Sequence, residues 1–140
     1  MYKIPLSMHT LKIKIYYEDT DAGGVVYYAN YLRYLERART ELLAEKGINV
    51  AEYHNKGYLL AVVHVDIYYK KPARLGEIIE VKTEIIAITT VTLTLKQEIF
   101  RDDVALVEAT VKLVCLNTEG KPQRLPSEFN SLSSTKHNSV

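Results

Sequence analysis

Apolar and polar residues alternate along most of the chain, and a period of two is typical of strands that bury one face. The first such stretch runs from Leu11 to Tyr17 and places Tyr17 on the inward face. Four more stretches follow later in the chain, at about 61–69, 79–87, 91–99 and 105–115. Each has one apolar face and one mixed face, so the pattern predicts an antiparallel sheet with a single buried side.

One stretch, which begins near Asn30, has helical spacing instead. Apolar residues recur there at every third or fourth position, at Leu32, Leu35, Ala38, Leu42 and Leu43. Asn30 has the side chain of an N-cap and Gly47 suits the position just after a helix, which bounds a helix of about 17 residues. A short second helix is expected around Val50–Asn55. The predicted fold is therefore α+β, with a five-stranded antiparallel sheet wrapped around one long central helix.

The length of 140 residues is sufficient for one domain with its own hydrophobic core. We expect a single domain over residues 1–126, because no linker or repeat interrupts that part of the sequence. Residues 127–140 are rich in Ser, Asn and Thr, and they are expected to form a flexible C-terminal tail.

Charge and composition argue against several classes of protein. The formal net charge of +1 gives no reason to expect general affinity for nucleic acid. No uncharged apolar stretch reaches the roughly 18 residues of a membrane-spanning helix, so no transmembrane segment is expected. The one cysteine, Cys115, cannot form an intrachain disulfide, and we interpret it as a buried thiol in a cytoplasmic protein. The four histidines lack metal-ligand spacing, so no metal site is expected.

The segment with the strongest chemical character lies between the first strand and the long helix. Three acids, Glu18, Asp19 and Asp21, stand just before a pair of glycines. Unpaired N–H groups at a helix N-terminus can polarise a carbonyl group, and a nearby carboxylate can attack it or activate water. Together these groups suit hydrolysis of an activated acyl group such as a thioester. Ordinary turn and helix-dipole chemistry is the alternative interpretation, and composition alone leaves it open.

Three segments of the sequence are distinctive: DTDAGGVVYYANY at 19–31, YLERARTE at 34–41 and VDIYYKKPARLG at 65–76. They resemble the 4-hydroxybenzoyl-CoA thioesterase family, and within it the YbgC-like acyl-CoA thioesterases. The resemblance extends over roughly residues 10–126. It implies a hotdog fold, hydrolysis of an acyl-CoA to free acid and CoA, and no metal or redox cofactor. It also implies a homo-oligomer, a dimer or tetramer, with active sites at a dimer interface.

The resemblance also implies which residues form the site. Asp21 corresponds to the family's catalytic carboxylate, which acts as nucleophile or general base, and the choice between these roles stays open. Backbone N–H groups near Tyr28 and Ala29 would polarise the thioester carbonyl. The remaining substrate-binding residues implied are Tyr17, Gly24 and Val25, with Lys70, Lys71 and Arg74 for the CoA phosphates. For the three basic residues, a solvated strand end is an equal alternative.

One position departs from the family pattern. Many YbgC-like members have a histidine seven residues after the catalytic aspartate, where this chain has Tyr28. Thioesterases of aromatic acyl groups in the wider family also have tyrosine there. The expected substrate is a short-chain or an aromatic acyl-CoA. Tyr28 leaves the choice between these acyl groups open and puts a histidine-assisted mechanism in doubt.

Other candidates have simpler interpretations. Glu18 and Asp19 are expected to be structural or solvated, and His64 with Asp66 to lie on a polar outer face or a subunit contact. Three rival functions remain: a non-catalytic acyl-CoA-binding protein, a thioesterase that acts on acyl carrier protein, and a dehydratase of the same fold. The dehydratase is disfavoured because the long helix contains no histidine.

Overall fold

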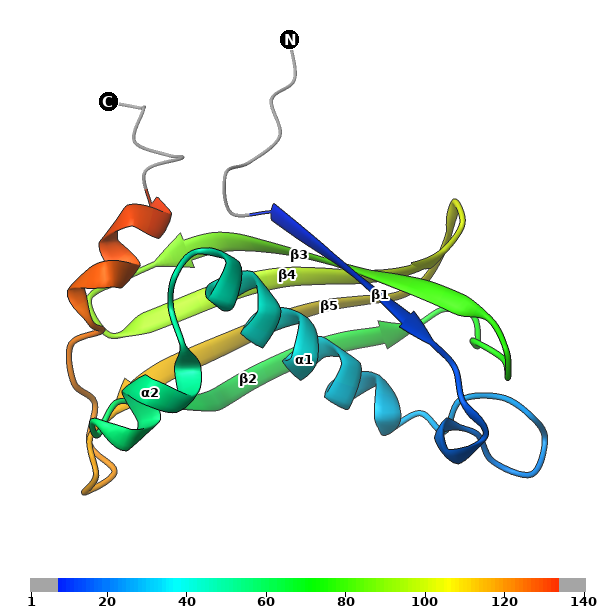
Figure 1. The fold of residues 1–140 in the computed structure, drawn as a ribbon, viewed down its shortest axis with the longest axis horizontal. Helices are drawn as coiled ribbons and strands as arrows, with labels where there is room; N and C mark the ends of the chain where they lie inside the picture. The colour runs from blue at the N-terminus through cyan, green and yellow to red at the C-terminus, as the bar shows by residue number, and fades with distance from the viewer. Residues whose placement is uncertain (1–7, 134–140) are drawn as a thin grey trace, which may run out of the picture.

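The computed structural model describes residues 8–133, and its main feature is one curved antiparallel sheet. The strands have the spatial order β1-β3-β4-β5-β2 (Figure 1). Their bounds are Met8–Lys14 for β1, Leu59–Tyr69 for β2, Ile78–Ile88 for β3, Thr92–Arg101 for β4 and Val104–Leu116 for β5. The predicted five-stranded antiparallel sheet is confirmed.

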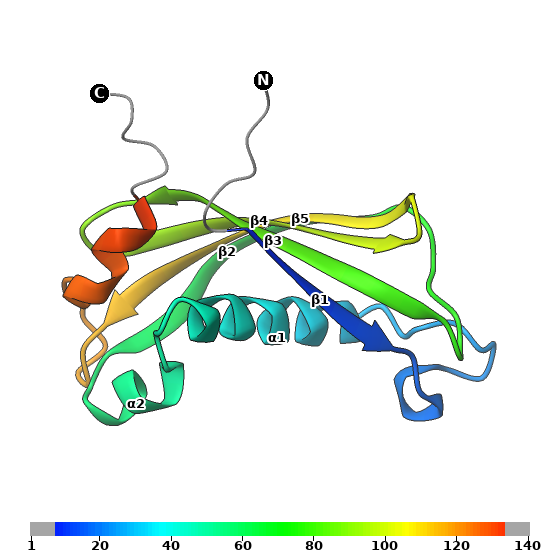
Figure 2. The ribbon, with the colours of Figure 1, turned by 45° about the horizontal axis from the view of Figure 1, so that its top comes forward.

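The long helix α1 (Asn30–Glu45) lies along the inner face of the sheet, which curls over it (Figure 2). The helix ends at Glu45 with Lys46 as its C-cap, and Gly47 takes the predicted position just after the helix, with a left-handed φ of +84°. There Ile48 N donates to Leu43 O at 2.8 Å and Gly47 N to Ala44 O at 3.0 Å, which satisfies carbonyl groups at the helix end. The second helix, α2 (Val50–Asn55), has the predicted position.

The predicted start of α1 is wrong by one residue. Ala29 occupies the N-cap position, and Asn30 is the first helical residue. The Asn30 side chain does not cap the helix, because its Nδ2 donates to the backbone oxygen of Asp19 at 2.9 Å. The amide therefore fastens the preceding loop to the helix.

The buried stripe of α1 differs from the prediction at its first turn. Leu35, Ala38, Leu42 and Leu43 are buried as expected, whereas Leu32 is 43% exposed. Tyr31 and Tyr34 are buried in its place, on the same side of the helix as Leu35 and Ala38. Aromatic side chains therefore fill the core under this end of the sheet.

The inner faces of β3, β4 and β5 are buried as the alternation predicts. Gln97 is fully buried among them, and its Nε2 donates to Leu35 O and to Thr83 Oγ1, each at 2.9 Å. Its Oε1 accepts from Arg39 Nη1 at 3.2 Å. This amide joins α1 to the centre of the sheet.

Cys115 is buried as predicted, and burial raises the pKa of its thiol.

The expected flexible tail is wrong for its first half. Ser127–Ser133 form a 3₁₀ helix, and Phe129 and Leu132 are buried in the core. Two apolar residues three positions apart fall on one side of a 3₁₀ helix, which explains how a Ser-rich segment packs. Residues 134–140 lie outside the described part of the chain.

Strand β2, at one edge of the sheet, is largely uncovered by the other described residues. Residues 62–66 are all exposed, and the strand has an irregularity between Val62 and His64. Val63, which the alternation over 61–69 places on the inward face, is 56% exposed, although Ile67 packs against the core.

Within residues 8–133 no helix has the length and apolar character that a membrane crossing requires.

Candidate active site

Asp21 lies on a tight loop whose shape is fixed by local hydrogen bonds. Asp21 N donates to Val25 O and Gly24 N donates to Asp21 O, both at 3.0 Å. Gly24 has a φ of +79°, a backbone conformation that favours glycine. The Asp21 side chain is exposed, and its Oδ1 accepts from Gly23 N at 2.9 Å. The carboxylate is thus oriented by the glycine loop and open to a reactant.

Asp19 has a structural role, as predicted. Its Oδ2 accepts from Tyr16 N at 2.8 Å, and its backbone oxygen accepts from Tyr27 N at 3.1 Å. Burial, together with the charge of Asp19, raises the pKa of Tyr34, so this phenol stays protonated in the core. Glu18 is exposed.

The prediction that Tyr17 lies on the inward face of a strand is wrong. Strand β1 ends at Lys14, and Tyr17–Asp19 form a short 3₁₀ helix, in which Tyr17 is 78% exposed. The Asp19 carboxylate bonds the backbone just ahead of this turn and so favours it over continued strand.

The start of α1 supplies the second chemical feature of the site. No hydrogen bond from the N–H groups of Tyr28 or Ala29 to any described residue is formed. The Tyr28 ring is exposed and packs edge-on against Tyr69, with 6.0 Å between ring centroids. Free N–H groups and the positive end of the helix dipole therefore follow the Asp21 loop directly.

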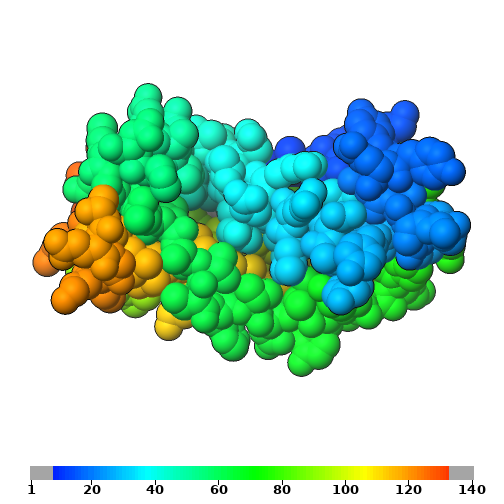
Figure 3. Space-filling model, turned by 90° about the horizontal axis from the view of Figure 1, so that it is seen from below, coloured from blue at the N-terminus to red at the C-terminus, as the bar shows by residue number. Residues whose placement is uncertain are grey.

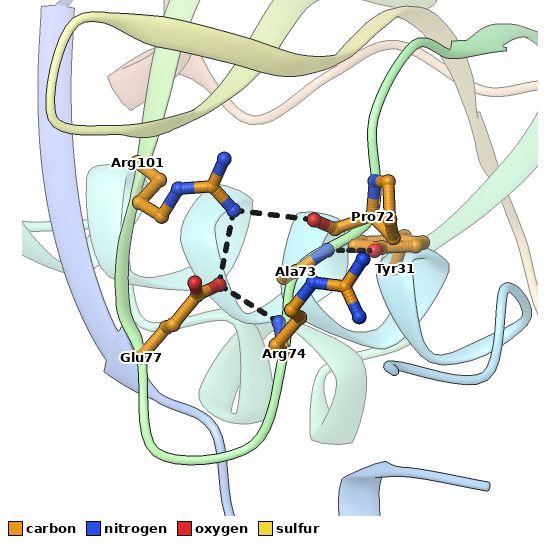
Figure 4. A network of polar contacts seen from close by, with 6 residues as sticks. All are labelled: Tyr31, Pro72, Ala73, Arg74, Glu77 and Arg101. Carbon is orange, nitrogen blue, oxygen red and sulfur yellow. Dashed lines mark hydrogen bonds and ion pairs between the residues drawn. The ribbon is translucent and has the colours of Figure 1, made fainter. Parts of the chain in front are cut away.

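A turn between β2 and β3, drawn in Figure 4 with Tyr31 of α1, is hydrogen-bonded to both features. Val26 N donates to Ala73 O at 2.9 Å, and Leu75 N donates to Gly24 O at 3.0 Å. Ala73 N donates to the hydroxyl of Tyr31, in the first turn of α1, at 2.9 Å. The family resemblance had included residues 65–76, and Tyr31 stands four residues before Leu35 on the buried side of the helix, but neither signal predicted these contacts.

The predicted phosphate-binding residues differ in their surroundings. Lys70 Nζ forms an ion pair with Glu108 Oε2 at 2.8 Å, whereas Lys71 and Arg74 are exposed. Arg74 also lies opposite Val25 in an isolated β-bridge, which brings it beside the Asp21 loop. His64 and Asp66 are exposed on β2. Among residues 8–133, no three His, Cys, Asp or Glu side chains come together as a metal site.

A groove of about 550 Å³ separates β1 from α1, and it can be seen beside the blue N-terminal segment in Figure 3. Its lining includes Ile13, Tyr16, Asp19, Arg37 and Thr40, but not Asp21. A single chain therefore leaves the Asp21 carboxylate at its surface rather than inside this groove.

Comparison with known proteins gives consistent matches over this region. Residues 16–132 match the family model of the thioesterase-like superfamily. The chain is 38% identical to the acyl-CoA thioester hydrolase YbgC of Escherichia coli O6:H1, over 84% of this chain and 89% of that protein. It is 36% identical to the acyl-CoA thioesterase YbgC of Haemophilus influenzae, over 85% and 89%. A probable thioesterase from Bartonella henselae superposes with a TM-score of 0.79 at 34% identity, over 85% and 99%. The fold is the hotdog fold that the resemblance implied.

We expect Gly24→Ala to destabilise the protein by about 1 kcal/mol, because a side chain at a φ of +79° strains the backbone. Apart from its chain neighbours, a Cβ atom there would have no atom within 4 Å, so no steric clash adds to the backbone strain. Gly23→Ala is the matched control, since Gly23 has no left-handed φ and its Cβ would meet only Asp21 Oδ1 at 3.4 Å. Thermal unfolding of the two variants measures the difference, and an equal loss in both would contradict this account.

Proposed function

Because the chain belongs to the thioesterase-like superfamily and is a thioester hydrolase, we propose that it hydrolyses an acyl-CoA to the free acid and CoA. The observation that carries the proposal is the exposed Asp21 carboxylate on a loop that leads directly to free N–H groups at the start of α1. The similarity to two YbgC proteins, named as acyl-CoA thioesterases, supports CoA as the carrier.

In the proposed mechanism, the N–H groups of Tyr28 and Ala29 donate to the thioester carbonyl oxygen. They stabilise the negative charge that develops there when the carbonyl carbon is attacked. Asp21 either attacks that carbon itself, forming an anhydride that water then cleaves, or removes a proton from the attacking water. The C–S bond breaks and the CoA thiolate leaves, which needs little help from a general acid.

The acyl group of the proposed substrate is short-chain or aromatic. Tyr28 and Tyr69 expose their rings beside the helix start, and Tyr27 packs against Tyr28 with 5.0 Å between centroids. This aromatic surface favours a flat or compact acyl group over a long flexible one. Tyr28 takes the place of a histidine in this proposal, and only its backbone has a catalytic role.

The proposed active unit is a homodimer, alone or within a tetramer, formed through the edge of β2. Val62, Val63 and Val65 are exposed along that edge. An exposed apolar strand edge is a template for pairing with another strand, and a second copy of this chain presents the same edge. Tyr69 ends β2 and contacts Tyr28, so this interface adjoins the helix start.

The proposed enzyme is cytoplasmic, and its single, buried cysteine is consistent with a reducing compartment.

Asp21→Asn should retain the fold and reduce turnover by roughly 10²- to 10⁴-fold, because the amide neither attacks nor accepts a proton. The assay follows release of free thiol from short-chain, long-chain and aromatic acyl-CoAs. Glu18→Gln, which changes an exposed neighbour, is the control and should retain activity. A folded Asp21→Asn variant with wild-type turnover would exclude the mechanism.

The same assay separates the rival functions. Binding of intact acyl-CoA without thiol release would indicate a non-catalytic binding protein. Release only from acyl carrier protein thioesters would change the carrier but keep the chemistry.

For the CoA phosphates, we expect Lys71→Ala and Arg74→Ala each to raise KM roughly two- to fivefold, as exposed charge pairs are weak. The value of kcat should not change, because neither side chain reaches the reacting atoms in this proposal. Lys70→Ala should have a smaller effect, since its charge is already paired with Glu108. Exposed Lys112, on β5, supplies the control variant Lys112→Ala. A KM that is insensitive to both Lys71 and Arg74 would place the phosphates elsewhere.

For the dimer, Val63→Glu places a charge in the middle of the uncovered edge and should convert the assembly to monomers of 16.0 kDa. Sedimentation velocity measures the change, and thiol release should fall with it. Thr10→Glu, on the opposite edge strand β1, is the matched control and should remain a dimer. A Val63→Glu variant that stays dimeric would move the interface away from β2.

A further inference from the structure

The turn at residues 72–77 has contacts that reach beyond the site residues. On one side it pairs with the Asp21 loop through Ala73 and Leu75, and with α1 through Tyr31. On the other side it is joined to the end of β1, because Ile15 N donates to Glu77 O at 2.8 Å and Gly76 N to Ile15 O at 3.0 Å. Three separate segments, the Asp21 loop, α1 and the end of β1, therefore depend on the shape of this one turn.

Two charged side chains close the turn (Figure 4). Glu77 Oε1 accepts from the backbone N–H of Arg74 at 2.8 Å, across the turn. Arg101, at the end of β4, donates from Nη1 to Glu77 Oε1 at 3.0 Å and to Pro72 O at 3.2 Å. Arg101 thus bonds both ends of the turn at once.

The partial burial of this pair distinguishes it from an ordinary surface ion pair. Each side chain is 28% exposed, compared with 46% and 42% for Lys70 and Glu108. Lower exposure reduces screening by water and salt, and a guanidinium that donates to two fixed acceptors has defined geometry. The pair is therefore suited to fix the distance between the two ends of the turn, at Pro72 and Glu77.

We propose that Arg101 and Glu77 are positioning residues that fix the Asp21 carboxylate relative to the N–H groups at the start of α1. This inference rests on the proposed hydrolysis by Asp21. Neither side chain belongs to the Asp21 loop or to α1, and both act through the backbone of the turn. The carboxylate is connected to the turn by Val26 and Gly24, and the helix start is connected to it by Tyr31.

A shift of the turn would change the distance between these two halves of the site. A misplacement of about 1 Å far from the reacting atoms can cost roughly 100-fold in rate. The side chains proposed to bind CoA, Lys71 and Arg74, keep their charges when Arg101 or Glu77 is changed. Loss of positioning should therefore appear in kcat more than in KM.

The central experiment replaces Arg101 and Glu77 and measures kcat, KM and thermal unfolding. Arg101→Met keeps the aliphatic stem but removes both hydrogen bonds, and kcat should fall roughly 10- to 100-fold with KM changed less than twofold. Arg101→Lys keeps one charged donor and should recover part of kcat.

Changes at Glu77 test the other half of the pair. Glu77→Gln keeps an oxygen acceptor and should lower kcat less than Glu77→Ala does. The double variant Arg101→Met/Glu77→Ala should lose less than the product of the two single losses, because both act on one turn.

Asp103→Asn is the matched control, since it removes a charge from the same β4–β5 turn without touching the network. It should keep wild-type kcat. Equal losses in Asp103→Asn and Arg101→Met would attribute the effect to the turn's general charge and overturn the inference.

Hydrogen exchange supplies a readout that does not depend on activity. The amides of Val26, Ala73 and Leu75 donate the bonds that link the turn to the loop and the helix, and they should exchange faster in Arg101→Met. Unchanged exchange at these amides, or faster exchange with wild-type kcat, would overturn the inference. If the wild type released no thiol from any acyl thioester, the proposed function would fail, and the exchange rates alone would then decide whether Arg101 holds the turn.

Discussion

The backbone pairing between residues 24–26 and 73–75 is the contact on which the candidate site depends. A loop built from acids and glycines has little apolar surface, and its conformational entropy would oppose any single arrangement. Two hydrogen bonds to Ala73 and Leu75, together with the left-handed Gly24, overcome that freedom. The two aspartates have different roles. Asp19 accepts hydrogen bonds from Tyr16 N with its carboxylate and from Tyr27 N with its backbone oxygen. Asp21 has one carboxylate oxygen with no bond to a described residue. The exposed aspartate is thus held mainly by the backbone of its loop, with one bond from Gly23 N to its own carboxylate.

At this end of the fold, buried tyrosine supplies both apolar surface and a hydrogen-bonding hydroxyl, which leucine lacks. Tyr31 is buried like a core residue, yet its hydroxyl accepts the Ala73 N–H. Burial raises the pKa of Tyr31, so the phenol stays neutral and its oxygen remains an ordinary acceptor. A leucine at this position would fill space but leave a buried N–H without a partner, at a cost of about 1–3 kcal/mol. The same ring contacts Tyr69, which in turn contacts Tyr28, so one aromatic row extends from the core to the surface.

Local pattern was sufficient to predict the strands and the end of α1, because alternation and a glycine at a left-handed position are decided by neighbouring residues. It failed where a side chain bonds a backbone group that the local period does not reveal. Asn30 has the chemistry of an N-cap, but the Asp19 carbonyl takes its amide, and the strand expected to include Tyr17 stops where Asp19 bonds Tyr16. The packing of Phe129 and the bonds of Arg101 to Pro72 and Glu77 join segments far apart in sequence, so no local period reveals them. The family resemblance pointed to Asp21 and to residues 65–76, whereas the hydrogen bonds between them came only from the three-dimensional structure.

The exposure of Asp21 has a consequence for the chemistry. Hydrogen bonds from N–H groups stabilise a developing negative charge far better in a site that excludes water than in one open to it. One chain alone leaves Asp21 and Tyr28 exposed, and it also leaves the edge of β2 uncovered. These two surfaces adjoin, because Tyr69 at the end of β2 packs against Tyr28. A second chain that covers the β2 edge in the proposed dimer would therefore also reduce the access of water to the start of α1. The proposed dimer would therefore cover the exposed strand edge and shield the open site from water through the same contact.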